Sequence, residues 1–194
     1  MKKPEILSPA GNLEKLKFAF AYGADAVYAA GKNYSLRNFS GNFDDAGLTE
    51  AVRYAHAINK KIYITVNVFP HNRDLEGIKN HLKFLNEIKP DGLIISDLGV
   101  FSMAKKEAPA IPVHISVQSN NLNYMEVNEW HSLGAKRIVL ARELSFDEIR
   151  EIREKCPQME LEIFVHGAIC MSYSGRCLLS DYMAGRSANS GECA

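Results

Sequence analysis

Short runs of β-branched and apolar residues alternate along the chain with longer stretches whose apolar residues have helical spacing. The runs predict seven strands, near residues 5–8, 25–29, 61–68, 91–96, 112–117, 136–141 and 159–165. In the stretches between them, Leu13, Leu16 and Phe20 would share one helix face, and Val127, Trp130 and Leu133 another. This alternation predicts parallel strands joined by crossover helices.

The connections between these elements differ on the two sides of the predicted sheet. Gly23 and Gly134 each stand where a helix should end in a left-handed cap, directly before a strand. Long polar segments, such as residues 30–47 and 116–123, follow strands instead. In a (β/α) barrel, the loops after the strands build the active face.

Two α/β architectures fit seven parallel strands. A (β/α)8 barrel has eight strands and roughly 250 residues, so this chain would be an incomplete TIM-like barrel that stops before closure. A doubly wound open sheet is the alternative. We favour the barrel because three strands alternate strictly, whereas strands covered by helices on both faces should be continuously apolar.

The alternation also predicts which side chains point into the barrel. The inward sets on the third, fifth and seventh strands would be Tyr63, Thr65 and Asn67, then His114, Ser116 and Gln118, then Glu162, Phe164 and His166. Asn67, Gln118 and His166 would then converge near the open top. An antiparallel sheet with one solvated face, or a core network of satisfied polar groups, would give a similar pattern.

Composition narrows the possible functions only slightly. The chain has 194 residues, of which 46% are hydrophobic, with 23 basic and 23 acidic residues. This charge balance predicts neither a large basic surface for nucleic acid nor attraction to anionic membranes. Because the chain starts without an apolar signal core and contains no apolar window long enough for a bilayer span, we expect a cytoplasmic protein with no membrane association.

Three cysteines crowd into the last 25 residues of the chain. Cys170, Cys177 and Cys193 have six and then fifteen residues between them and are interleaved with glycines, so they can converge on one metal or cluster. Thiolates select zinc, copper(I) or iron–sulfur centres. Cys156 precedes the seventh strand and should lie at the opposite end, roughly 20 Å away, as an inert thiol.

Two other interpretations of this segment remain open. A thiol protease could use Cys170 as nucleophile and His166 as base, because residues four apart share a face of a helix. Alternatively, the cysteines could be small buried thiols in a loop. The protease hypothesis leaves Cys177 and Cys193 without a role.

Several motifs along the chain carry a family resemblance. They are Leu7-Ser8-Pro9-Ala10-Gly11, Asp25-Ala26-Val27-Tyr28 with Leu36-Arg37, Ser116-Val117-Gln118, Arg142-Glu143-Leu144-Ser145 and, most specifically, the segment 162–180. With these motifs the sequence resembles the collagenase-like peptidases, peptidase family U32, whose members include prephenate-dependent tRNA uridine hydroxylation proteins. The resemblance implies a barrel over residues 1–165 and a cluster-binding cysteine- and glycine-rich segment over 166–194, ending before a further C-terminal region.

The resemblance also implies a function and a cofactor. Members of the family are implicated in iron–sulfur-dependent hydroxylation of tRNA wobble uridine or of a ribosomal RNA cytidine, so RNA is the expected substrate. A [4Fe-4S] cluster would take Cys170, Cys177 and Cys193, with its fourth ligand absent from this chain, and a prephenate-like carboxylated donor would supply the oxygen. The alternatives are a collagenase-like peptidase and a non-catalytic subunit paired with a paralogue; a homo-oligomer is also possible.

Candidate site residues follow from these placements. The expected catalytic residues are His166, Glu162 and Arg142, and the expected substrate-binding residues are Arg37, Asn67, Asp97, Ser116, Gln118 and Glu143. Arg142 could clamp a carboxylate or phosphate. Alternatively, Arg142 and Glu143 could both form surface ion pairs. Asp97 could instead cap the following helix, and His166 could be a satisfied core histidine. Glu162 inside the barrel needs a partner such as an arginine, His114 or a tyrosine.

Overall fold

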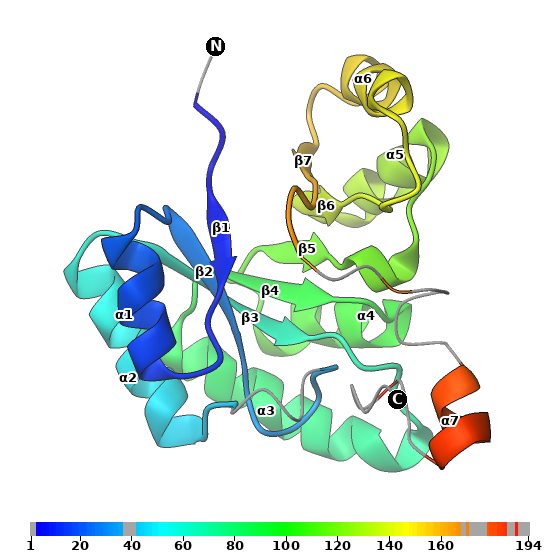
Figure 1. Ribbon diagram of the computed structural model, residues 1–194. Coiled ribbons are helices and arrows are strands. Elements are labelled where there is room, and N and C mark those ends of the chain that lie inside the picture. The colour runs from blue at the N-terminus through cyan, green and yellow to red at the C-terminus, as the bar shows by residue number, and fades with distance from the viewer. Residues whose placement is uncertain (1–2, 37–41, 168–169, 171–177, 186–188, 190–194) are drawn as a thin grey trace.

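The sheet is the centre of the molecule and is curled into a half-barrel. A computed structural model describes residues 3–36, 42–167, 170, 178–185 and 189. Within them, seven strands pair in sequence order from β1 to β7, and every pairing is parallel (Figure 1). The predicted incomplete TIM-like architecture is confirmed.

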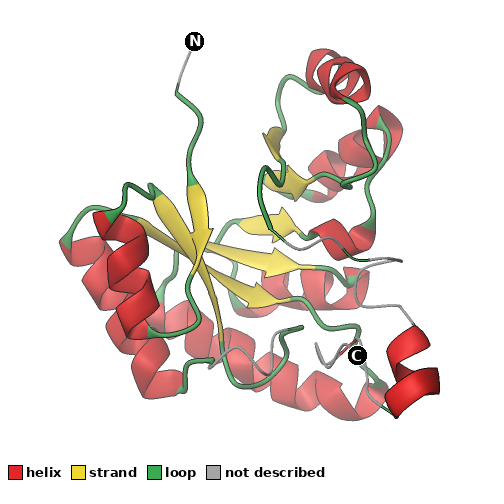
Figure 2. Ribbon diagram, viewed as in Figure 1, coloured by secondary structure: helices red, strands yellow, loops and turns green. Residues whose placement is uncertain are grey.

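Strands and helices alternate as the sequence pattern predicts. The elements in chain order are β1 Leu7–Pro9, α1 Leu13–Ala21, β2 Ala26–Ala30, α2 Asp45–Ala57, β3 Lys61–Val66, the 3-10 helix η1 Asn72–Asp74, α3 Leu75–Ile88, β4 Gly92–Ile95, α4 Leu98–Glu107, β5 Val113–Ile115, the 3-10 helix η2 Val117–Ser119, α5 Tyr124–Leu133, β6 Arg137–Val139, α6 Phe146–Lys155, β7 Glu160–Glu162 and α7 Leu179–Ala184. Figure 2 shows the helices gathered around the outside of the sheet.

Local sequence signals determine where the outer helices begin and end. Five of them begin after a residue whose side chain accepts a hydrogen bond from the backbone N–H three positions on: Asn12, Asp44, Asp97, Asn123 and Ser145. Gly23 and Gly134 have φ angles of 99° and 96°, which L-residues with side chains rarely adopt. Both glycines therefore turn the chain sharply from a helix into the next strand.

The two faces of the sheet separate apolar from polar side chains. On β3, Ile62, Ile64 and Val66 are buried in the main core between sheet and helices. Tyr63 faces the other way and packs in a separate small cluster with Ala26 and Ile94. The predicted division of β3 into outward apolar and inward polar positions is confirmed.

The seventh strand is shorter than the sequence pattern predicts. The prediction extends it to residue 165, but β7 ends at Glu162, and Ile163 and Val165 are 40% and 88% exposed. The reason is that, among the described residues, β7 pairs with β6 alone. The last bond between them runs from the Leu140 N–H to the Glu162 carbonyl oxygen at 2.9 Å, and a strand without a partner does not continue.

Candidate active site

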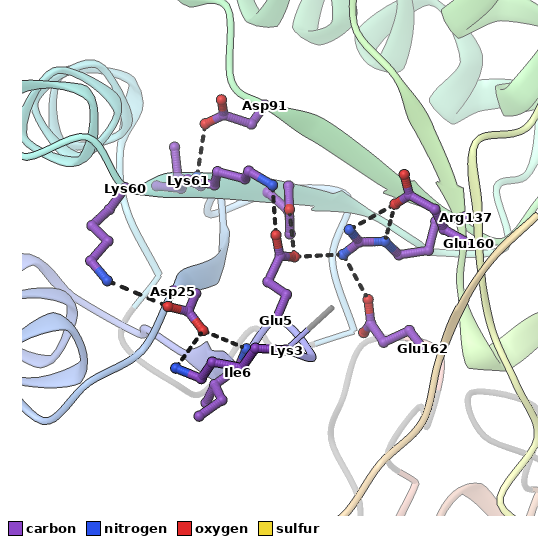
Figure 3. Close-up of polar contacts among 12 residues, drawn as sticks. Lys3, Glu5, Ile6, Asp25, Lys60, Lys61, Asp91, Arg137, Glu160 and Glu162 are labelled. Atoms are coloured by element: carbon purple, nitrogen blue, oxygen red, sulfur yellow. Dashed lines mark hydrogen bonds and ion pairs between the residues drawn. The ribbon is translucent and has the colours of Figure 1, made fainter. Parts of the chain in front are cut away.

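A cluster of charged side chains fills the amino-terminal end of the sheet interior (Figure 3). Arg137, the first residue of β6, donates to Glu5 and Glu160 at 2.9 Å each and to Glu162 at 3.4 Å. The Tyr63 hydroxyl donates to Glu5 at 2.7 Å. One guanidinium thereby joins β6 and β7 to the segment before β1, and we call these five residues the Arg137 cluster.

The charge states within the Arg137 cluster follow from burial and pairing. Burial acts to raise the pKa of Glu5, but hydrogen bonds from Lys61, Tyr63 and Arg137 overcome it and hold this pKa at about 2. Burial raises the pKa of Glu162, against the opposing charge of Arg137. The prediction that buried Glu162 needs a partner such as an arginine is confirmed, whereas its catalytic role stays a prediction.

His114 on β5 lies beside this cluster and is 3% exposed. Its ring meets the Tyr63 ring edge-on, with the centroids 4.7 Å apart, and its Nδ1 has no hydrogen-bond partner among the described residues. Burial lowers the pKa of His114 to about 3, and the charge of Arg137 adds to this effect. Gly92 makes room for the ring, since a Cβ there would lie 2.9 Å from its Cε1 atom. His114 is therefore a neutral, closely packed ring.

Small polar side chains, without charge, occupy the other end of the interior, where the strands end. Asn67 follows β3, Ser96 follows β4, and Ser116 and Gln118 follow β5. The Asn67 Nδ2 donates to the Gln118 Oε1 at 3.4 Å, and the Ser96 hydroxyl lies 3.1 Å from the Asn67 carbonyl oxygen and 3.3 Å from the Gln118 Oε1. Ser116 also donates to the Gln118 Oε1. The predicted meeting of Asn67 with Gln118 is confirmed.

Arg142, in the loop after β6, connects two parts of the segment that follows β7. Its guanidinium lies over the Phe164 ring, 4.3 Å from the centroid, and its Nη1 lies 3.8 Å from the Cys170 Sγ. Neither Arg142 nor Glu143 forms an ion pair with any described residue, so the surface ion-pair alternative has no support in that part of the chain. A guanidinium on an aromatic face beside a thiol can still bind a carboxylate or phosphate.

The remaining predicted residues are not gathered at one point. His166 and Glu143 are exposed, and no hydrogen bond among the described residues links His166 to Asn67 or Gln118. The alternative that His166 is a core histidine is therefore wrong. Asp97 caps α4 by accepting a hydrogen bond from the Val100 N–H at 2.9 Å. This is the helix-capping role given above as the alternative to substrate binding.

The cysteines divide as the sequence suggests. Cys156 is fully buried at the end of α6, its thiol 3.4 Å from the Tyr124 carbonyl oxygen, whereas Cys170 is exposed. Arg37, Cys177 and Cys193 lie outside the described residues. Over the described ranges, no group of three or more His, Cys, Asp or Glu side chains is placed to hold a metal ion.

Sequence reasoning missed two features of this region. Ser96 was not predicted, although it follows β4 as Ser116 follows β5, so strand position could have identified it. The second feature is Asn189, whose side-chain amide bonds both the N–H and the carbonyl oxygen of Phe69 at 2.9 Å. A contact between residues 120 positions apart left no signal in the pattern.

Comparison with known proteins places the chain in a family. The family model described as peptidase family U32 matches residues 11–194. The tRNA hydroxylation protein P of Escherichia coli K12 is 50% identical over 193 residues, which cover 100% of this chain and 43% of that protein. The 23S rRNA 5-hydroxycytidine C2501 synthase of the same organism is 36% identical, covering 97% of this chain and 28% of that protein. The chain thus spans less than half the length of these relatives.

A solved structure supports the fold. The U32 peptidase Mk0906 superimposes with a TM-score of 0.70 over 88% of this chain and 73% of its own, at 15% sequence identity. At that identity the likeness concerns the fold alone. No helix within the described residues is long and apolar enough to cross a membrane.

Proposed function

The chain belongs to peptidase family U32, and from that membership we propose that it carries the barrel region of an enzyme that hydroxylates RNA bases. The observation that carries the proposal is the 50% identity, along the whole chain, to a tRNA hydroxylation protein. A more distant relative is a 5-hydroxycytidine synthase that acts on ribosomal RNA. The reaction class, hydroxylation of a base, is what these two relatives share, while their RNAs differ. Since these RNAs reside in the cytoplasm, we place the activity there.

The carboxyl ends of the strands supply groups suited to such a reaction. Replacing C–H by C–OH on a base requires an oxygen donor that is itself reduced. We assign the carboxylate of a prephenate-like donor to Arg142, whose guanidinium already lies over Phe164 and whose charge no carboxylate among the described residues neutralises. Asn67, Ser116 and Gln118 would contact the base.

The proposed cofactor is a [4Fe-4S] cluster held by Cys170, Cys177 and Cys193. Cys170 fits this role because it is exposed at the active face. Cys156 does not fit, because it is buried at the other end of the barrel and its thiol donates a hydrogen bond to the Tyr124 carbonyl oxygen. When bound, such a cluster would supply an iron able to polarise or reduce the oxygen donor.

The protease hypothesis receives less support from the geometry. It needs Cys170 and His166 on one face of a helix, but the chain is not helical over residues 163–167. The Cys170 thiol instead has the Arg142 guanidinium as a hydrogen-bond partner. Peptide cleavage is therefore an outcome to be tested beside hydroxylation.

A chimera tests the proposal. In it, this chain replaces the matching region of the Escherichia coli tRNA hydroxylation protein P, in a strain that lacks that protein. We expect mass spectrometry of tRNA nucleosides to detect a species one oxygen atom heavier than its precursor. Cys170→Ser should abolish this species, whereas the matched control Cys156→Ala should retain it. Soluble chimera that cleaves peptides but leaves tRNA unmodified would overturn the proposal.

A further inference from the structure

A directional chain of hydrogen bonds crosses the carboxyl end of the interior. It begins at the Leu36 backbone N–H, which donates to the Asn67 Oδ1 at 3.2 Å. It continues from the Asn67 Nδ2 to the Gln118 Oε1 at 3.4 Å. Asn67 is 7% exposed, and Gln118 is half-buried at the end of the chain of bonds.

The direction of these bonds is fixed by their first member. A backbone N–H can only donate, so Asn67 must turn its oxygen toward Leu36 and its nitrogen toward Gln118. Gln118 must then present its oxygen to Asn67. The Ser116 hydroxyl also donates to that oxygen, and the Ser96 hydroxyl can join it. A flipped Gln118 would place two NH2 groups face to face, so its orientation is held.

This arrangement leaves Gln118 with one unused capability. The two N–H groups of its Nε2 have no acceptor among the residues that the structure describes, while its oxygen is saturated. An amide that could rotate would accept or donate equally well. Held in this way, Gln118 can only donate to whatever approaches the carboxyl face.

We propose that Gln118 recognises the carbonyl oxygen that uracil carries at the ring position where cytosine carries an amino group, and that Asn67 is the positioning residue that sets the polarity of Gln118. The assignment rests on the proposed function and deepens it. No charged side chain contributes to the group Asn67, Ser96, Ser116 and Gln118, which suits a neutral carbonyl better than a carboxylate. An amino group at the same ring position would place its N–H donors against the N–H donors of Gln118 Nε2, so a base that carries one would be rejected.

Oligouridylate and oligocytidylate of equal length, each with the same fluorophore, are suitable probes because they exchange a carbonyl for an amino group on the ring. We expect the protein to bind oligouridylate about tenfold more tightly. Gln118→Glu should abolish or reverse this ratio, since a carboxylate still accepts from Asn67 and Ser116 but offers acceptors outward. Gln118→Leu should abolish it. Asn67→Asp should also lower the ratio, because the introduced carboxylate would accept from Leu36 yet could not donate to Gln118.

Gln158→Glu is the matched control, with the same change of charge at an exposed residue that bonds Asn128 instead. It should leave the ratio unchanged. Thermal unfolding within a few degrees of the parent shows that each variant is folded. Equal binding of both probes by the parent, absent binding, or a ratio that survives Gln118→Leu would overturn the proposal.

Two further results separate this assignment from the function it rests on. If Gln118→Glu weakened binding of prephenate with the ratio unchanged, Gln118 would contact the oxygen donor and the proposal would be wrong. If the chimera hydroxylated tRNA while Gln118 had no effect on the ratio, only the recognition assignment would fail. Loss of hydroxylation by Gln118→Leu with retained hydroxylation by Gln158→Glu would support it.

Discussion

The two ends of the barrel interior contain arginines in opposite situations. Arg137 at the amino-terminal end is 11% exposed in its side chain and meets three carboxylates, whereas Arg142 at the carboxyl end has an aromatic ring and a thiol as partners. The charge of Arg137 is fully paired with carboxylates, which suits a stabilising role. The charge of Arg142 is not paired with a carboxylate among the described residues, so it can still bind a ligand. This agrees with the general division of such barrels into a stabilising and a catalytic end.

The largest expected effect comes from breaking the saturated end. Arg137→Met should lower the free energy of unfolding by about 3–5 kcal/mol, because it leaves Glu5, Glu160 and Glu162 partly buried without their shared cation. Chemical denaturation measures the loss. Arg150→Met is the control, since the side chain of that arginine is 66% exposed and its one ion pair with a described residue is with Asp147 on the surface. Equal losses for both variants would show that the Arg137 cluster is not a stabilising element.

An intermediate effect is expected when pH weakens the same end. The pKa of Glu5 is about 2 in the folded protein against the usual 4.5, so its contribution is complete above pH 4.5 and is lost as pH falls toward 2. His114 acts in the same direction, because burial lowers its pKa from 6.5 to about 3. Glu162, with its pKa raised, acts in the opposite direction.

The net result should be a free energy of unfolding that decreases as pH falls below 6.5. Glu5→Gln should cost about 1–3 kcal/mol near neutral pH and should make the decrease below pH 4.5 shallower. Urea unfolding at a series of pH values measures both quantities. A slope that Glu5→Gln leaves unchanged would assign the acid sensitivity to other groups.

The smallest effect on stability belongs to the other arginine. Arg142→Met should change the free energy of unfolding by less than about 1 kcal/mol, because its side chain is half-buried and forms no ion pair among the described residues. The same substitution in the chimera should abolish the hydroxylated nucleoside. If Arg142→Met were strongly destabilised but still produced the hydroxylated nucleoside, the carboxyl end would have the stabilising role here given to the amino-terminal end.

The sequence pattern predicts the fold well because the signals are local. Seven strands follow from apolar runs, and the meeting of Asn67 with Gln118 follows from alternation along β3 and β5. The length of β7 was overestimated because alternation continues to His166 although the strand loses its partner after Glu162. The alternation of residues along β7 carries no information about where the neighbouring strand β6 ends.

The charged end was harder to predict. Arg137 at the start of a strand looks like a solvated residue, and nothing near it in the sequence identifies Glu5 as its partner. The expectation that Glu162 needs a partner such as an arginine, His114 or a tyrosine was the one sequence signal that pointed toward this cluster. The contact of Arg142 with Cys170 depends on the path of a loop, which periodicity does not specify.

The bond between Glu5 and Arg137 also bears on the order of events during synthesis. The two residues are 132 positions apart, so at about 5–20 residues per second the ribosome adds Arg137 on the order of ten seconds after Glu5. Until then Lys61 and Tyr63 are the described residues that can bond Glu5, and the early strands form a sheet with an unpaired growing edge. The bond that ties the segment before β1 to β6 can therefore form only after the five strands between them have been synthesised.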